Sequence, residues 1–356
     1  MNKNLAVGYF FNAPFQETLS PFLPRVTETF FAWPGVLSCR PAPVFTDEVR
    51  ARFLDDLRWA KANGIALDTL FNANCYGELA VSTRLADSVM RVLDEMAAAD
   101  VPPDVVTTTS PFVARVLKKR APGVRVRASI NMRIHGTVGF EAVGDLFDEF
   151  YLSRERHRDL AYVRRVAEWA EANGKRIGMQ LNSGCLRQCP FQTFHDNLHG
   201  HGDGRRPEDV AAGKEYDFSF FLCRTRYARD KAFEDFLRAT WIRPEDAHLF
   251  APYVDFFKLA IRRHPRPEAV LRAYATESFD GNLLTLMDPD HAAAFAPDGI
   301  DNKSFPADWA ESGVAANCAD DCRHCGKCAA VLARVRHPVR GEEGAPRSMH
   351  APASVE

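Results

Sequence analysis

The chain has 356 residues, of which 46% are hydrophobic and 26% are charged, and its formal net charge is −2. This composition excludes a disordered or fibrous protein and supplies enough apolar residues for one large core with an appendage. The nearly balanced charge gives no reason to expect nucleic acid or an anionic membrane as an obligatory partner.

The first apolar run, residues 5–11, is broken by Asn12 and Pro14. It is too short for a membrane span and no small-residue cleavage site follows it, so we expect a first strand in a cytoplasmic protein without membrane contact. Nine cysteines in such a chain favour metal binding or redox chemistry over a disulfide framework.

Short apolar or β-branched runs then alternate with longer amphipathic segments, which is typical of β-α units on a parallel sheet. The clearest helix lies at 46–64, with Thr46 as N-cap and Gly64 just past its end, and 157–174 repeats this design. We predict eight strands, at residues 5–11, 27–33, 65–71, 104–109, 124–130, 148–153, 176–182 and 254–261.

Eight such units fit an α/β fold of the (β/α)8 TIM-barrel type. A doubly wound open sheet is the alternative, but no GxGxxG follows the first strand. We therefore expect a barrel over residues 1–290, a cysteine-rich metal-binding extension over 291–335 and a disordered tail over 336–356. Residues 182–253 contain no convincing barrel strand and should form a long loop with short helices.

In a barrel, functional groups gather where strands end. Asn72 follows the third predicted strand, Asn131 the fifth and Arg154 the sixth. We expect Arg154 to anchor an anionic substrate or donor by bidentate hydrogen bonds, and the two asparagines to orient it. The competing interpretation of Arg154 is an ion pair with Glu155 or Asp159.

Residues 182–201, after the seventh strand, carry Cys185, Cys189 and three histidines. Thiolates in a cytosolic protein indicate zinc or an iron–sulfur cluster, and Cys223 could fold back as a third ligand. The alternative is that these cysteines are small buried apolar groups. His195, like His199 and His201, is a candidate metal or substrate ligand, or a capping and packing group.

Three cysteines suit a [4Fe–4S] cluster in which one position is left for another group. Gly184 would permit close approach of the backbone. The fourth position could be taken by Cys39, by Cys75, by a cysteine of the extension, or by a substrate oxygen.

The extension contains a compact run formed by Cys318, Cys322, Cys325 and Cys328. We expect these four cysteines to bind metal as a group, either a second [4Fe–4S] cluster or zinc. The spacing also matches radical S-adenosylmethionine proteins, but their motif follows the first barrel strand, whereas this one lies beyond the last.

Several segments, in this order, resemble the U32 family, historically called collagenase-like peptidases. They are "SPFVARVLKKRAPGVRVRASINM", "FYLSRERHRDL", "QLNSGCLRQCPFQTFHDNLHGH", "WIRPEDAHLF" and "FFKLAIRRHPRPEAV". The resemblance covers residues 5–275. It implies a TIM-type barrel and, in some branches, a cysteine-bound [4Fe–4S] cluster for oxygen-independent hydroxylation of ubiquinone precursors or RNA bases.

Carried onto this chain, the resemblance implies that Cys185, Cys189 and Cys223 are cluster ligands and that Cys39 is similar to an early ligand of the ubiquinone-pathway members. This chain departs from those members in having three middle cysteines instead of four, and in its extra tail cysteines. These departures affect the assignment of the substrate more than the assignment of the cofactor.

The leading hypothesis is an enzyme, an iron–sulfur oxidoreductase of the U32 type. It would carry out oxygen-independent hydroxylation or related chemistry on a small molecule or an RNA, with an electron donor as a further partner. The alternatives are a U32-type peptidase and a non-catalytic iron–sulfur partner in a hetero-oligomer with another family member. The sequence has no HExxH or GxSxG motif to support a peptidase.

Overall fold

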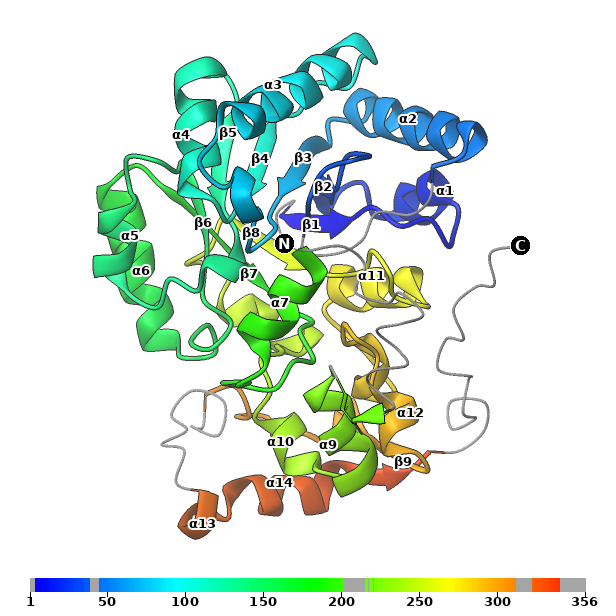
Figure 1. The fold of residues 1–356 in the computed structure, drawn as a ribbon. Helices are drawn as coiled ribbons and strands as arrows, with labels where there is room; N and C mark the ends of the chain where they lie inside the picture. Colours follow the sequence, from blue (N-terminus) through cyan, green and yellow to red (C-terminus); the bar gives the residue numbers. More distant parts are fainter. Residues whose placement is uncertain are drawn as a thin grey trace.

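The computed structural model describes residues 4–38, 45–200, 215–216, 218–219, 221–311 and 322–339. They form a barrel of parallel strands wrapped by helices, with a second lobe built from the long seventh loop and the C-terminal extension (Figure 1). None of the described helices is long and apolar enough to cross a membrane.

The eight strands pair in sequence order, and β1 pairs with β8 in parallel to close the barrel. This confirms the predicted (β/α)8 fold, because each predicted segment overlaps one strand. The strands are β1 Leu5–Gly8, β2 Val26–Phe31, β3 Ala66–Phe71, β4 Val105–Thr108, β5 Arg125–Ala128, β6 Glu149–Tyr151, β7 Arg176–Gln180 and β8 Phe256–Leu259.

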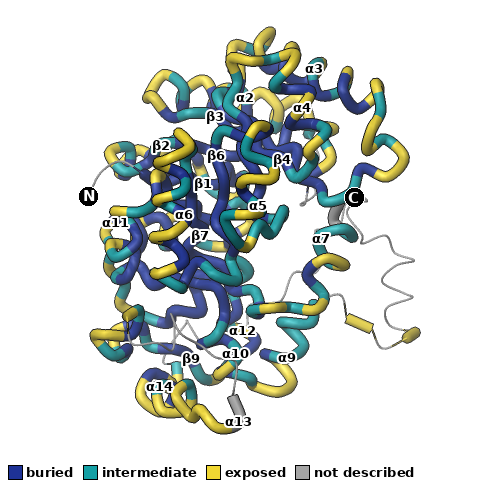
Figure 2. The backbone as a smooth tube through the Cα atoms, turned by 90° about the vertical axis from the view of Figure 1, so that its left-hand side faces the viewer, coloured by how far each residue is buried: buried dark blue, intermediate teal, exposed yellow. Residues whose placement is uncertain are grey.

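The helices of the β-α units surround the strands, which are buried on both faces (Figure 2). Thr46 caps α2 as predicted, since its hydroxyl accepts the amide of Val49 at 3.3 Å, and Gly64 takes the left-handed conformation after that helix. These helices are α1 Phe15–Leu19, α2 Asp47–Ala62, α3 Thr83–Ala98, α4 Pro111–Arg120, α5 Thr137–Ala142, α6 Leu160–Ala172 and α11 Pro267–Thr276.

The second lobe packs beneath the barrel as drawn in Figure 1. The long loop between β7 and β8 comprises α7 Gln192–Gly200, which lies at the barrel in Figure 1, and then α9 Leu222–Asp230, α10 Phe233–Leu237 and the 3₁₀ helix η4 Pro244–Leu249. The part after α11 comprises η5 Leu283–Leu286, α12 Ala292–Phe295, β9 Asp298–Ile300, η6 Asn302–Ser304, α13 Cys322–Cys325, α14 Lys327–Val335 and β10 Arg336–Pro338. The remaining 3₁₀ helices are η1 Ser20–Phe22, η2 Gly77–Leu79 and η3 Ile130–Met132.

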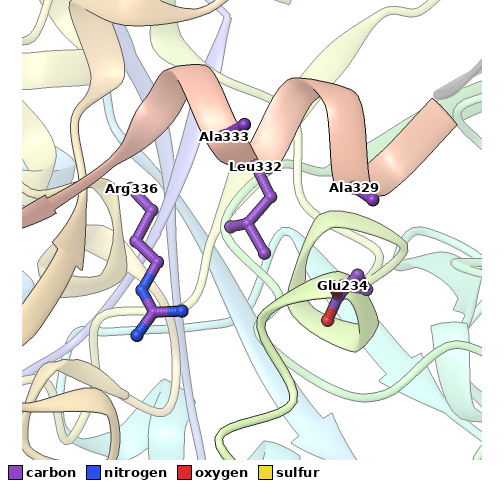
Figure 3. A pocket seen from close by; sticks show the side chains of 5 residues that line it. All are labelled: Glu234, Ala329, Leu332, Ala333 and Arg336. Atoms are coloured by element: carbon purple, nitrogen blue, oxygen red, sulfur yellow. The ribbon is translucent and has the colours of Figure 1, made fainter. Parts of the chain in front are cut away.

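The extension is anchored by ordinary packing as well as by backbone pairing. Helix α14 buries Leu332 and Val335 and contacts α10, and β10 pairs antiparallel with β9. A hollow of about 350 Å³ remains between α10 and α14, lined on one side by Leu332 and Arg336 and on the other by Glu234 (Figure 3). The sequence predicts that the extension ends at residue 335. In the structure the ordered chain continues past that residue into β10. The disorder predicted for the tail falls, from residue 340 on, outside the described residues.

A charged network fills the inside of the barrel around Arg127, which is completely buried on β5. Its guanidinium donates to Glu28 on β2 at 2.5 and 2.6 Å, to Asp68 on β3 at 3.1 Å and to Glu149 on β6 at 2.7 Å. It also lies over the ring of Phe256, with the guanidinium carbon 4.3 Å from the centroid. One cation thus ties four strands together from within.

Burial changes the protonation of these acids. Desolvation raises the pKa of Asp68 to about 7, although the charge of Arg127 opposes the rise. The pKa of Glu149 is lowered despite its burial, because Arg127, Arg125 and Arg176 surround it. The network therefore combines paired charges with an acid that readily holds its proton.

We predict that Arg127→Met lowers the free energy of unfolding by about 3–5 kcal/mol, because it leaves buried carboxylates without their cation. Urea denaturation measures this change. Arg115→Met is the matched control: Arg115 pairs with Asp145 at 2.7 Å, both side chains are more than half exposed, and its loss should cost less than about 1 kcal/mol. Equal effects of the two substitutions would contradict the role given to Arg127.

Candidate functional site

The start of the seventh loop is fixed by the side chain of Asn182. The side-chain amide of Asn182, which is fully buried just after β7, donates to the carbonyls of Ala260 at 3.0 Å and Leu286 at 3.2 Å. Its side-chain oxygen accepts the amide of Ala260 at 2.8 Å. These bonds join the end of β7 to the end of β8 and aim the loop out of the barrel mouth.

Gly184 is held next by two aromatic residues of the second lobe. Its carbonyl accepts Nε2–H of His291 at 3.0 Å and the hydroxyl of Tyr227 at 3.5 Å. A Cβ atom at this position would lie 2.8 Å from the His291 ring and 3.1 Å from Met287. Only glycine fits here without displacing its neighbours, which is the close approach expected from the sequence.

Three cysteines converge directly after this anchor. Cys185 and Cys189 lie on the loop, Cys223 lies on α9, and all three are half-buried. Burial, with smaller contributions from the neighbouring Cys185 and Cys189, raises the pKa of Cys223 to about 12. Burial likewise raises the pKa of the Cys189 thiol, with a contribution from Cys185. The structure thus brings together three of the four predicted barrel ligands, and the fourth, Cys39, lies outside the described residues.

These thiols are not arranged around one metal ion. Within the described part of the chain, no three His, Cys, Asp or Glu side chains are placed to hold a single ion. For the tail cysteines, Cys325 is exposed and Cys328 is half-buried against the core, whereas Cys318 lies outside the described residues.

Arg154 and Glu155, which follow β6, both contact the cysteine loop. Nη1 of Arg154 donates to Sγ of Cys185 at 3.6 Å, and the Glu155 carboxylate accepts the amide of Gln188 at 2.6 Å. The arginine that pairs with Asp159, at 3.1 Å, is Arg156. The predicted site arginine therefore lies at the cysteines.

Helix α7 is attached to other loops of the barrel mouth through Asp196. This carboxylate accepts Arg133 of the fifth loop at 2.8 Å, Asn74 of the third loop at 3.5 Å and Gln192 of α7 itself at 3.0 Å. His195 lies on the same helix and its ring meets Phe221 edge-to-face at 5.2 Å between centroids. His199 belongs to α7 and His201 lies outside the described residues.

The predicted asparagines stand elsewhere on the same barrel end. Asn72 is buried just after β3, and Asn131 lies half-buried in η3. Sequence reasoning missed a neighbouring pair, Ser153 and His135, whose Oγ and Nδ1 atoms are 2.8 Å apart. It also missed the anchor of Gly184, because His291 is 107 residues away in the chain and nothing local marks it.

Comparisons with known proteins agree with this fold. No family model matches the chain. Over 238 residues it is 23% identical to an uncharacterized protease of Methanocaldococcus jannaschii, spanning 65% of this chain and 67% of the relative. The solved structure of a U32 peptidase is similar with a TM-score of 0.50 and 15% identity, over 73% of this chain and 93% of that one. The structural likeness shows the fold, and with the related protease it confirms the resemblance to the U32 family.

The buried histidine that anchors Gly184 should make the site sensitive to acid. Burial lowers the pKa of His291 to about 3, and among the described residues its Nδ1 has no hydrogen-bond partner. Between pH 6.5 and 3 the unfolded chain therefore binds a proton that the native state does not. In this pH range His291 therefore lowers the free energy of unfolding as the pH falls, by about 1.4 kcal/mol per pH unit.

We predict that His291→Gln, which keeps an N–H donor but cannot titrate, removes the contribution of His291 to the pH dependence of stability. Urea unfolding at pH 6 and pH 5 measures the difference. The wild-type free energy of unfolding should fall more steeply than that of the variant. His157, whose Nε2 lies 2.7 Å from the Thr240 carbonyl and whose pKa burial also lowers to about 3, is present in both proteins and cancels in the comparison. Identical slopes would contradict the assignment.

Proposed function

We propose that this U32-type barrel protein is an iron–sulfur oxidoreductase whose cluster is bound at the barrel mouth. The observation that carries the proposal is the convergence of Cys185, Cys189 and Cys223 from two elements, with Arg154 against one sulfur. Burial raises the pKa values of the Cys189 and Cys223 thiols, so these two groups do not ionise together on their own. Bound iron would supply the positive charge that stabilises three thiolates in such a place.

We propose a cluster here in preference to a single ion. Zinc draws four ligands to about 2.0–2.3 Å from one centre. The described residues offer no such group, whereas a [4Fe–4S] cluster carries its thiolates on different irons and holds them farther apart. Three cysteines would leave one iron for another ligand.

Cys39 is our proposed fourth ligand. Cys75 is one alternative, and it lies in the third loop, where its sulfur accepts the amide of Gly77 at 3.3 Å. A cysteine of the extension or an oxygen of the substrate are the other candidates. The extension itself, through Cys318, Cys322, Cys325 and Cys328, would bind a second cluster or zinc.

When bound, the cluster would supply electron transfer or a Lewis-acidic iron. The chemistry we propose is oxygen-independent hydroxylation or a related reaction on a small molecule or RNA, with an external electron donor. Asn72, Asn131 and His195 would orient the substrate at the mouth. The enzyme could also act in a hetero-oligomer with another U32-type chain, and purification of the native complex would show whether such a partner stays bound.

A U32-type peptidase is the second candidate, because the related chains are named as proteases or peptidases. Ser153 and His135 also form a hydrogen-bonded pair of a nucleophile and a base at the mouth. A peptidase built on this pair would react with a fluorophosphonate probe at Ser153 and lose peptide hydrolysis in Ser153→Ala. Our proposal expects neither labelling nor hydrolysis.

The cluster proposal predicts which cysteines retain iron. After anaerobic purification, Cys185→Ala, Cys189→Ala, Cys223→Ala and Cys39→Ala should each contain up to about four fewer irons per chain than the wild type. Cys75→Ala should retain them, because Cys75 is not a proposed ligand. Iron and sulfide analysis provides the measurement. If Cys185→Ala and Cys189→Ala keep the iron content of the wild type, the proposal is wrong. If Cys75→Ala loses iron and Cys39→Ala does not, Cys75 and not Cys39 is the fourth ligand.

A further inference from the structure

We infer that Arg154 and Glu155 are positioning residues that clamp the cysteine loop at two points, and that Arg154 in addition tunes the reduction potential of the bound cluster through its contact with the Cys185 sulfur. This inference rests on the proposed function. It gives Arg154 a task different from the substrate anchor predicted from the sequence.

The clamp follows from strand order. Strands β6 and β7 are neighbours in the barrel, so the loops that follow them leave the mouth side by side. Arg154 is the third residue after β6, and its Nη1 meets Sγ of Cys185 at 3.6 Å. Glu155 is the next residue, and its carboxylate accepts the Gln188 amide at 2.6 Å. One dipeptide thereby holds both ends of the turn between Cys185 and Cys189.

The turn needs such a hold. Gln188 has a φ of +51°, in the left-handed region that residues other than glycine rarely adopt. A conformation of this kind persists only when the surroundings fix it. The charge-assisted hydrogen bond from the Gln188 amide to the Glu155 carboxylate fixes the backbone one residue before Cys189.

The contact with sulfur has an electronic consequence. A guanidinium N–H directed at a sulfur stabilises negative charge on it, and a reduced cluster carries one electron more than an oxidised one. Hydrogen bonds to the sulfurs and local charge are among the factors that set cluster potentials. Arg154 should therefore raise the reduction potential, and its removal should lower it.

The test compares Arg154→Met, Arg154→Lys and Arg156→Met in a reductive titration followed by EPR, without substrate. At the wild-type midpoint potential, Arg154→Met should show a reduced-to-oxidised ratio about tenfold lower, which corresponds to about 59 mV for one electron. Arg154→Lys should recover part of the ratio, because it keeps the charge and an N–H donor. Arg156→Met is the matched control, since Arg156 is two residues away and pairs with Asp159 instead.

The second arm separates the clamp from the tuning. Glu155→Ala should lose its cluster to a chelator several-fold faster than the wild type, with no fall in potential, because it removes a negative charge. Glu168→Ala, an exposed acid on α6, is its control and should lose the cluster at the wild-type rate.

The outcomes are distinguishable. A wild-type protein without iron and sulfide would overturn the proposed function and this inference together. A wild-type cluster whose potential is unchanged in Arg154→Met, or lowered equally in Arg156→Met, would overturn the tuning alone. If Glu155→Ala loses its cluster to the chelator at the wild-type rate, the positioning role of Glu155 is wrong.

Discussion

The buried guanidinium of Arg127 is the constraint on which the rest of this structure depends. A cation placed inside a closed barrel must be matched there by carboxylates, and Glu28, Asp68 and Glu149 come to it from three other strands. Shifting any of these strands by one residue would turn its acid out of the barrel and remove one of the three carboxylates around the cation. The network therefore fixes the register of β2, β3, β5 and β6, and with it the position of each loop at the mouth.

The candidate site inherits this order through contacts that cross between loops. Arg154 and Glu155 of the sixth loop contact the seventh loop, and Asp196 attaches α7 to the third and fifth loops. The second lobe adds the remaining support, because Tyr227 and His291 hold the carbonyl of Gly184 immediately before Cys185. The three cysteines are consequently placed by the barrel and by the second lobe together.

The features of the fold that could be predicted from the sequence are those that depend on local sequence patterns. Alternating apolar runs located all eight strands, and the Thr46 cap located the start of α2. The spacing of Cys185 and Cys189 after a strand predicted the candidate site, which stays a prediction. The barrel network could not be foreseen in the same way, since Glu28 and Arg127 are 99 residues apart and each stands within an otherwise ordinary strand. The same holds for Ser153 with His135 and for Arg154 with Cys185, where only the neighbouring of loops in the closed barrel creates the contact.

The central claim is that the barrel itself, and not the cysteine-rich extension, holds an iron–sulfur cluster. The most direct measurement is iron and acid-labile sulfide content, with EPR after reduction, on anaerobically purified protein in which Cys318, Cys322, Cys325 and Cys328 are all replaced by Ser. The account predicts about four irons and four sulfides per chain in this variant, with the EPR signal of a reduced [4Fe–4S] centre. A folded variant without iron and sulfide would contradict it, and residues 182–201 would then have to be interpreted as a histidine-rich substrate loop.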